Sequence, residues 1–283
     1  MPADHAWAIM PVMANPDLTR AAISDVLAQS VPTRLLVIAQ GIAGAWRDEL
    51  ELTAQASDGR ILIWWHDPPL PSLSASWNAA LRFVWETGAT DALVVNSDVR
   101  LRADTILQLR HVCGLTHALF VSAVGVTGEQ FHPEEELIFC DDPDAEHPRL
   151  AKGGPDFSCF LITKAGHEQY PFDEGFVPAY CEDLDTHRRY MLGGDGDRIF
   201  SINLPFHHVD HGSGTLKGLT PQQRSAHEAR IGQSRAHYLA KWGGPVNQET
   251  YTIPFEAASA QAGVTTPELQ RAIQEGAQHG AES

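Results

Sequence analysis

Residues 91–98 read DALVVNSD, a short apolar run that ends in a polar and acidic turn. The run predicts a buried strand over 91–96, and amphipathic stretches on either side predict helices over 76–86 and 103–112. A strand between helices of about ten residues is typical of a βαβ unit in a parallel sheet. This stretch therefore indicates an open α/β fold.

The same alternation runs back to the start of the chain. Apolar runs predict strands over 6–12, 34–39 and 60–65, and amphipathic stretches predict helices over 18–29 and 45–56. Strands and helices in this order, joined by right-handed crossovers, form a doubly wound sheet. The expected fold class is α/β, with a doubly wound, mostly parallel sheet of the nucleotide-binding type.

The pattern is looser in the second half of the chain. After the apolar run 118–126, the segment 129–146 holds eight carboxylates and no Lys or Arg. Such a segment is typical of a solvated excursion, and the alternative is a loop that binds cations or shapes an acceptor site. Further strands are predicted over 157–163 and 198–204, and a helix over 183–192 should end at the glycine pair that follows it.

These elements predict one large domain over 1–245, with a first half at 1–112 and a second at 113–245. Residues 246–283 are expected to form a C-terminal helical extension. The sequence TTPE at 265–268 supports a helix there, because it fits a capping box with proline in the first turn.

Composition narrows the class of protein. The 283 residues include 36 acidic and 20 basic side chains, a net charge of −16 that opposes non-specific binding to nucleic acids and anionic membranes. The four cysteines form no C-x-x-C pair, so we expect reduced thiols. Without a signal-peptide pattern or a run of 18 apolar residues, the sequence predicts a soluble, cytoplasmic protein.

Two acidic clusters are candidates for chemistry. Asn96, Ser97 and Asp98 follow a predicted strand, where ligands of open α/β sheets bind, and a carboxylate there can hold Mg²⁺ or form only a local turn. Glu182 and Asp183 begin a predicted helix. Carboxylates at that position are favoured by the helix dipole, or one of them acts as a general base.

A third cluster is the sequence HHVDH at 207–211, with the glycine-rich segment 212–215 behind it. Neutral imidazole nitrogens bind metals, and glycine-rich turns offer backbone N–H groups to phosphate. A structural zinc site needs four ligands, and no cysteine is near. By itself this cluster is weak evidence for a metal site.

The order of these pieces resembles glycosyltransferase family 2, whose members have a GT-A fold. The likeness covers residues 6–216, and its strongest parts are FDEGFVPAYCEDLDTHRR at 172–189 and NSDV at 96–99. The resemblance implies inverting transfer of a sugar from a nucleoside diphosphate sugar to a hydroxyl group. It also implies a divalent metal, Mn²⁺ or Mg²⁺.

Positions of the metal site follow from the resemblance. In this family the acidic motif that ends a strand binds the metal and the nucleotide sugar, so Asp98 corresponds to the metal ligand, with Asn96 and Ser97 lining the site. A histidine near the end of the family domain often completes the metal site. Here either His208 or His211 can fill that place, and the sequence does not choose between them.

The base and the donor site follow in the same way. The family's Glu-Asp pair carries the catalytic base, which corresponds to Asp183, with Glu182 orienting the acceptor. The family usually has an acidic residue after its second strand, whereas this chain has Gln40, so the identity of the nucleotide base is open. The remaining residues expected at the donor site are Pro11, Ala14, Asn15, Ser76 and Asn78.

Other functions stay open from the sequence. A non-catalytic carbohydrate-binding protein would bind a glycan without a divalent ion, and a metal-dependent hydrolase could use the histidine cluster. A nucleotidyltransferase is disfavoured, because no glycine-rich basic loop follows the first strand. The acceptor could be a glycan, a lipid-linked sugar, a small metabolite or a modified base in nucleic acid, which the net charge disfavours.

Overall fold

The computed structural model describes residues 5–134, 155–209 and 221–256. The strands in these ranges are β1 Ala6–Val12, β2 Thr33–Gln40, β3 Ile61–His66, β4 Asp91–Val95, β5 Val99–Arg100, β6 Phe120–Val126, β7 Cys159–Thr163 and β8 Ile199–His208. The helices are α1 Pro16–Leu27, α2 Ala45–Gln55, α3 Leu73–Glu86, α4 Thr105–Thr116, α5 Lys164–Gln169, α6 Glu182–Gly193 and α7 Pro221–Trp242.

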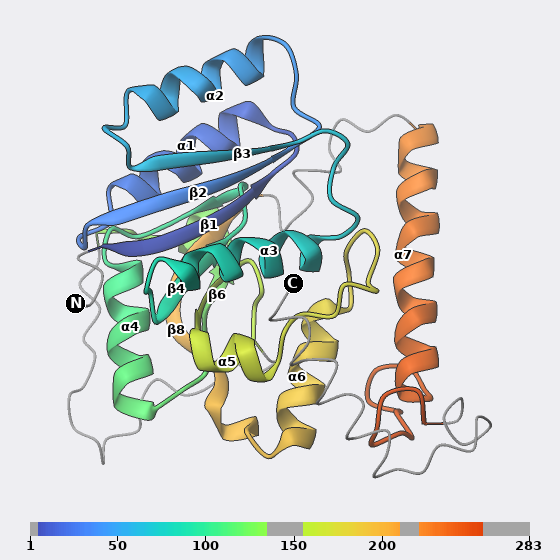
Figure 1. Ribbon diagram of the computed structural model, residues 1–283. Coiled ribbons are helices and arrows are strands. Elements are labelled where there is room, and N and C mark those ends of the chain that lie inside the picture. The colour runs from blue at the N-terminus through green and yellow to red at the C-terminus, as the bar shows by residue number, and fades with distance from the viewer. Residues whose placement is uncertain (1–4, 135–154, 210–220, 257–283) are drawn as a thin grey trace.

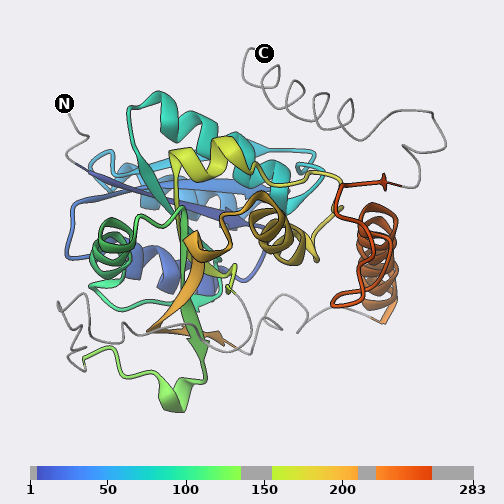
Figure 2. The ribbon, with the colours of Figure 1, turned by 90° about the horizontal axis from the view of Figure 1, so that it is seen from below.

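The strands form one sheet in the order β3-β2-β1-β4-β7-β6-β8-β5, with helices against both faces (Figures 1 and 2). The pairs among β3, β2, β1 and β4 are parallel, as is β6 with β8. Strand β7 is antiparallel to both neighbours, and β5 is antiparallel to β8. The predicted α/β class with a mostly parallel sheet is confirmed.

Alternating side chains of the central strands pack into two separate cores. Ala8 and Met10 of β1 contribute to the core that includes α1, α2 and α4. Trp7 and Ile9 of the same strand contribute to the core that includes α3 and part of α6. Because both faces are covered, these strands are apolar throughout, which is why the sequence shows them as unbroken apolar runs.

The antiparallel pairing of β7 positions the site. Val95 at the end of β4 lies opposite Cys159 at the start of β7. Beyond the turn 96–98 the chain enters β5, and Val99 there pairs with His208 at the end of β8. The register therefore places the ends of β4 and β8 and the start of β7 around one turn.

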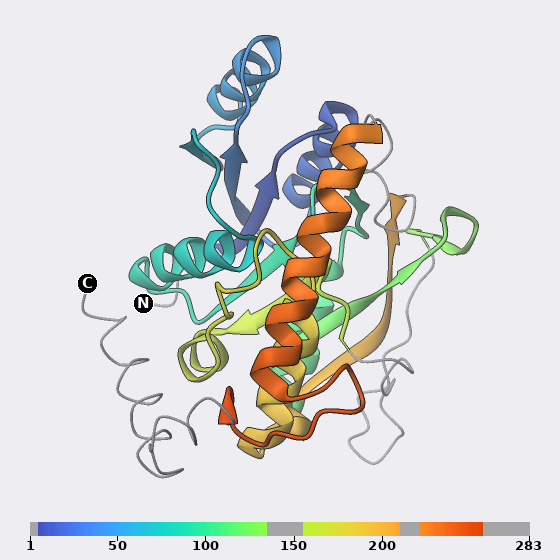
Figure 3. The same ribbon diagram turned by 90° about the vertical axis from the view of Figure 1, so that its right-hand side faces the viewer.

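Helix α7 has no counterpart among the predicted elements. It stands beside α6 at the edge of the molecule (Figures 1 and 3). Phe176, Tyr238 and Trp242 form a small core of their own, with Leu184 of α6 packed against it. This helix forms one wall of the candidate site.

Two helices begin earlier than the sequence pattern indicated, for local reasons. Pro16 begins α1 after Asn15, which is in the left-handed conformation. Ser72 caps α3, and its side chain accepts a hydrogen bond from the backbone N–H of Ala75 at 3.1 Å. The apolar periodicity alone shows neither residue as a start.

Several predictions fall outside the described residues: the helix at 265–268, most of the acidic segment 129–146, and His211. The division into halves and the boundary at 245 stay predictions. Among the residues that the structure describes, no helix is both long and apolar enough to cross a membrane.

Candidate functional site

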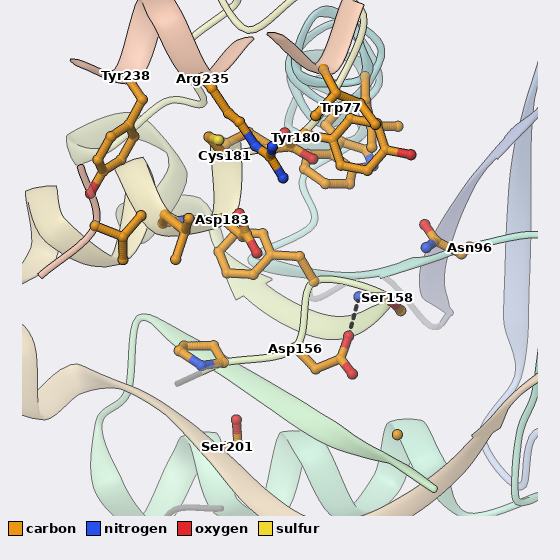
Figure 4. A pocket seen from close by; sticks show the side chains of 18 of the residues that line it. Trp77, Asn96, Asp156, Ser158, Tyr180, Cys181, Asp183, Ser201, Arg235 and Tyr238 are labelled. Atoms are coloured by element: carbon orange, nitrogen blue, oxygen red, sulfur yellow. Dashed lines mark hydrogen bonds between the residues drawn. The ribbon is translucent and has the colours of Figure 1, made fainter. Parts of the chain in front are cut away.

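A cavity of about 930 Å³ lies between the carboxyl end of β4, the start of β7, the first turn of α6 and one face of α7 (Figure 4). Asn96, Asp156, Ser158, Glu182 and Asp183 supply polar groups to its lining. The cavity thus brings together the strand-end motif and the helix-start motif, which are more than 80 residues apart in the sequence.

The turn after β4 holds Asp98 in a buried position, with 7% of the residue exposed. The backbone carbonyl of Asp98 accepts a hydrogen bond from the N–H of Val209 at 3.0 Å, which extends the pairing of β5 with β8. As a result, Oδ1 of Asp98 lies 3.4 Å from Nε2 of His208. Asp98 and His208 are therefore brought together, as the metal prediction requires.

The surroundings of His208 fit a cation ligand. Its Nε2 is buried, with Oδ1 of Asp98 3.4 Å away, and its Nδ1 lies 3.4 Å from Oγ of Ser158. Burial lowers the pKa of His208, but the hydrogen bond and charge of Asp98, with the charge of Asp156, outweigh burial and raise it overall. The negative charges of Asp98 and Asp156 that favour a proton on His208 would also favour a divalent ion at Nε2.

The described residues alone do not complete a metal centre. Within 5–134, 155–209 and 221–256 there is no group of three His, Cys, Asp or Glu side chains that could hold an ion. Mg²⁺ and Mn²⁺ in nucleotide sites typically take one or two protein ligands and complete their shell with phosphate oxygens and water. Asp98 and His208 suit that kind of site.

The start of α6 has an unusual backbone. Tyr180 and Cys181 both have positive φ angles, 79° and 69°, which non-glycine residues seldom adopt. Such conformations cluster at functional sites, where the surrounding structure holds them. This turn puts Glu182 and Asp183 in the first turn of α6 and in the lining of the cavity.

The two carboxylates have different environments. Glu182 is buried, and its Oε2 accepts no hydrogen bond from the described residues; burial and the charge of Asp183 raise its pKa to about 8. Asp183 is only partly buried, and its Oδ1 accepts a hydrogen bond from the N–H of Leu184 at 2.8 Å. Burial and Asp156 also raise the pKa of Asp183, but this N–H supports its ionised form. The raised pKa of Glu182 favours its protonated form, so Asp183 is the better candidate for the proton acceptor.

Asp185, two residues further on, has a structural role. It is fully buried and receives hydrogen bonds from Nε1 of Trp242 at 2.9 Å and Nε of Arg189 at 2.8 Å. Nζ of Lys241 lies 2.7 Å from Oδ1, the oxygen that also accepts from Trp242. Because all of these groups belong to α6 and α7, Asp185 joins the two helices and is not available to a substrate.

Sequence reasoning missed Asp156 and Ser158. Oδ1 of Asp156 accepts a hydrogen bond from the N–H of Ser158 at 2.8 Å, and the Ser158 carbonyl accepts one from the N–H of Asn96 at 2.9 Å (Figure 4). These bonds join the start of β7 to the end of β4. In the sequence, Asp156 is only a carboxylate just before a predicted strand. The antiparallel pairing of β7 with β4 brings the start of β7, and so Asp156, to the site.

Four of the predicted donor residues lie near the carboxyl ends of β1 and β2. They are Pro11, Ala14, Asn15 and Gln40. Because β1 and β2 are parallel to β4, these residues share an edge of the sheet with Asn96 and Ser97. The Oε1 of Gln40 accepts a hydrogen bond from the N–H of Leu70 at 3.0 Å, so it also holds the loop before α3. Of the nine residues predicted for the donor site, Asn96 lines the cavity itself.

Ser76 and Asn78 lie inside α3 with protein partners. Oγ of Ser76 donates to the carbonyl of Ser72 at 3.1 Å. Nδ2 of Asn78 donates to the carbonyl of Phe172 at 2.8 Å, and its Oδ1 accepts the N–H of Phe172 at 3.0 Å. Both residues are buried; the bonds of Asn78 join α3 to the backbone of Phe172, whereas the bond of Ser76 stays within the start of α3. The structure thus shows structural contacts for both residues, and their contact with a donor stays a prediction.

No family model and no curated protein sequence matches this chain. Solved structures do. The mannosyltransferase PcManGT of Pyrobaculum calidifontis, in complex with GDP-Man and Mn²⁺, is 11% identical, with a TM-score of 0.52 over 100% of this chain and 86% of that chain. TarS of S. aureus is 11% identical, with a TM-score of 0.51 over 71% of this chain.

The chain spans 35% of that TarS chain. A second TarS structure, of residues 1–349 in complex with UDP, is 10% identical over 70% of this chain, with a TM-score of 0.50. The chain spans 58% of it. At identities this low, the structural match shows a shared fold and nothing more. The chain has the GT-A fold, and the likeness predicted from residues 172–189 and 96–99 is confirmed at that level.

Proposed function

We propose that this GT-A chain is a glycosyltransferase that moves a sugar from a nucleoside diphosphate sugar to an acceptor hydroxyl with inversion. The observation that carries the proposal is one cavity lined by both the strand-end residue Asn96 and the helix-start pair Glu182 and Asp183. The complexes of PcManGT with GDP-Man and Mn²⁺ and of TarS with UDP support a nucleotide-sugar donor.

Asp183 acts as the general base. Its carboxylate takes the proton of the acceptor hydroxyl as that oxygen forms a bond to the anomeric carbon. The bond from this carbon to the diphosphate breaks on the opposite side, which inverts the configuration. Glu182, whose raised pKa favours the protonated form, would donate a hydrogen bond that orients the acceptor.

Asp98 and His208 would hold the metal, and Asn96 and Ser97 would line the donor side. Mn²⁺ or Mg²⁺ bound there supplies Lewis-acid stabilisation of the negative charge on the leaving diphosphate. His208 is the residue that the described structure offers for the histidine position. Pro11, Ala14, Asn15 and Gln40 contact the nucleotide along the same edge of the sheet.

Thermal unfolding tests the donor and the metal together. The protein is heated with UDP, GDP and their sugar conjugates, each with and without Mn²⁺, because a ligand of the native state raises the melting temperature. One nucleotide should give a metal-dependent rise, and Asp98→Ala should remove the metal dependence. If no nucleotide shifts the transition, the protein is better explained as a carbohydrate-binding protein or a hydrolase.

One substitution on α6 tests the base. Asp183→Asn should retain the metal-dependent stabilisation by the nucleotide and lose sugar transfer, since it removes a base and no donor contact. Slow hydrolysis of the donor in water provides a readout without a known acceptor. Transfer or hydrolysis at the wild-type rate in Asp183→Asn would contradict the assignment.

A further inference from the structure

Helix α7 contributes one face to the cavity. Ile231, Arg235, Tyr238 and Leu239 all line it, and spacings of three and four residues place them along one side of the helix. Three of these side chains are apolar or aromatic, and the fourth is a cation. Figure 4 shows Arg235 pointing from α7 into the cavity.

Arg235 is the cation of this cavity. Among the residues that line it, no other Lys or Arg is present in the described ranges, whereas Asp156, Glu182 and Asp183 supply three carboxyl groups. Arg235 is exposed, and no hydrogen bond or ion pair within the described part of the chain engages its guanidinium. Its charge still reaches the turn before α6, where it opposes the effect of burial on the pKa of Cys181.

The backbone that carries Arg235 is held firmly. Oγ of the preceding residue, Ser234, donates to the carbonyls of Ala179 at 2.7 Å and Val177 at 3.2 Å. About two turns further on, Nζ of Lys241 lies 2.5 Å from Asp173 and 2.7 Å from Asp185. Helix α7 is thereby fixed against the segment that carries Tyr180 and against α6. The backbone position of Arg235 at the cavity wall is therefore fixed, and the described residues supply no partner for its guanidinium.

Apolar surface lies next to this charge. Leu239 and Val246 line the cavity with 44% and 37% of their surface exposed, and Tyr180 lines it with 38% exposed. The indole Nε1 of Trp77, also a lining residue, is buried and donates no hydrogen bond in the described ranges. The cavity therefore has an apolar surface next to the cation Arg235, and the N–H of Trp77 has no acceptor among the described residues.

The cation belongs to the acceptor side. The donor phosphates are expected near Asp98 and His208, at the turn between β4 and β5. Arg235 approaches from α7, and in Figure 4 Asp183 lies between it and Asp156. Because the base faces the acceptor hydroxyl, a group beyond the base meets the acceptor and not the leaving diphosphate.

We propose that Arg235 binds an anionic group, a phosphate or a carboxylate, on an acceptor whose adjoining part is apolar and packs against α7. This inference rests on the proposed glycosyl transfer. A guanidinium matches both oxoanions with paired N–H donors, and apolar surface around it strengthens the contact. The hydroxyl of such an acceptor would lie within reach of Asp183.

Calorimetric titration with phenyl phosphate and with benzoate tests the site, using benzyl alcohol as the neutral counterpart. The full-length protein is first saturated with Mn²⁺ and the nucleoside diphosphate, UDP or GDP, that stabilises it, so the donor side is occupied. At least one anion should bind more tightly than benzyl alcohol. Arg235→Ala should weaken that binding about tenfold, the loss typical of one charge-assisted contact, and Arg235→Lys should retain part of it.

The controls separate the two proposals. Arg230→Ala removes an exposed arginine of α7 that does not line the cavity, and it should bind the anion as the wild type does. Affinity for the nucleoside diphosphate should be unchanged in Arg235→Ala. Equal binding of the anion by wild type and Arg235→Ala, or loss of nucleotide affinity in Arg235→Ala, would overturn the acceptor assignment. Absence of any nucleotide binding by the wild type would instead contradict the proposed function.

Discussion

Replacement of Glu182 by Gln should stabilise the protein at high pH. Burial and Asp183 raise the pKa of Glu182 from 4.5 to about 8 in the folded protein, whereas the unfolded chain has the ordinary value. Between these two values the folded state binds more protons than the unfolded state, so stability falls as pH rises. At 1.36 kcal/mol per pKa unit the loss reaches at most about 5 kcal/mol above pH 8.

The amide of Gln carries no charge at any pH and keeps the shape of the carboxyl group. The free energy of unfolding of Glu182→Gln should therefore fall less than that of the wild type between pH 5 and pH 9. The difference between the two proteins should grow as the pH rises above about 5. The test is urea unfolding of both proteins across this range, without metal or nucleotide.

Glu86→Gln is the matched control, because Glu86 is exposed at the end of α3. It should give a curve parallel to that of the wild type. The reasoning is refuted if Glu182→Gln also runs parallel to the wild type. That outcome would mean that the Glu182 carboxyl group is hydrated and ionised in the folded protein, so that it could compete with Asp183 as the base.

Two further predictions concern the neighbours of Asp183. Asp185→Ala should lower the free energy of unfolding by about 3 kcal/mol, because Arg189 and Lys241 lose a buried partner; a change below about 1 kcal/mol in urea unfolding would contradict its structural role. Asp156→Asn should move the acid limb of the pH dependence of kcat/KM to lower pH, because the charge of Asp156 raises the pKa of Asp183; a limb that stays in place would show that Asp183 is not the group that titrates.

The elements of the sheet could be predicted because their signals are local. Strands such as β1 and β4 are short apolar runs, and turn residues follow them directly, so periodicity and turn chemistry suffice. The same reasoning placed Asp98 at a strand end and Asp183 at a helix start. Helix α7 was missed, since its polar residues dominate its sequence and its apolar side chains matter only once α6 lies beside it.

The tertiary structure decided which of these side chains meet. Asp183 and Asp185 lie two residues apart, and about 100° of rotation per residue puts them on opposite sides of α6. One side faces the cavity and the other faces Trp242 and Lys241. The sequence by itself indicated the longer strands, the approximate positions of most helices and the acidic candidates, because those depend on neighbouring residues. The pairing of β7 with β4 and of α7 with α6 depends on contacts between distant segments, and those pairings brought Asp156 and Arg235 to the site.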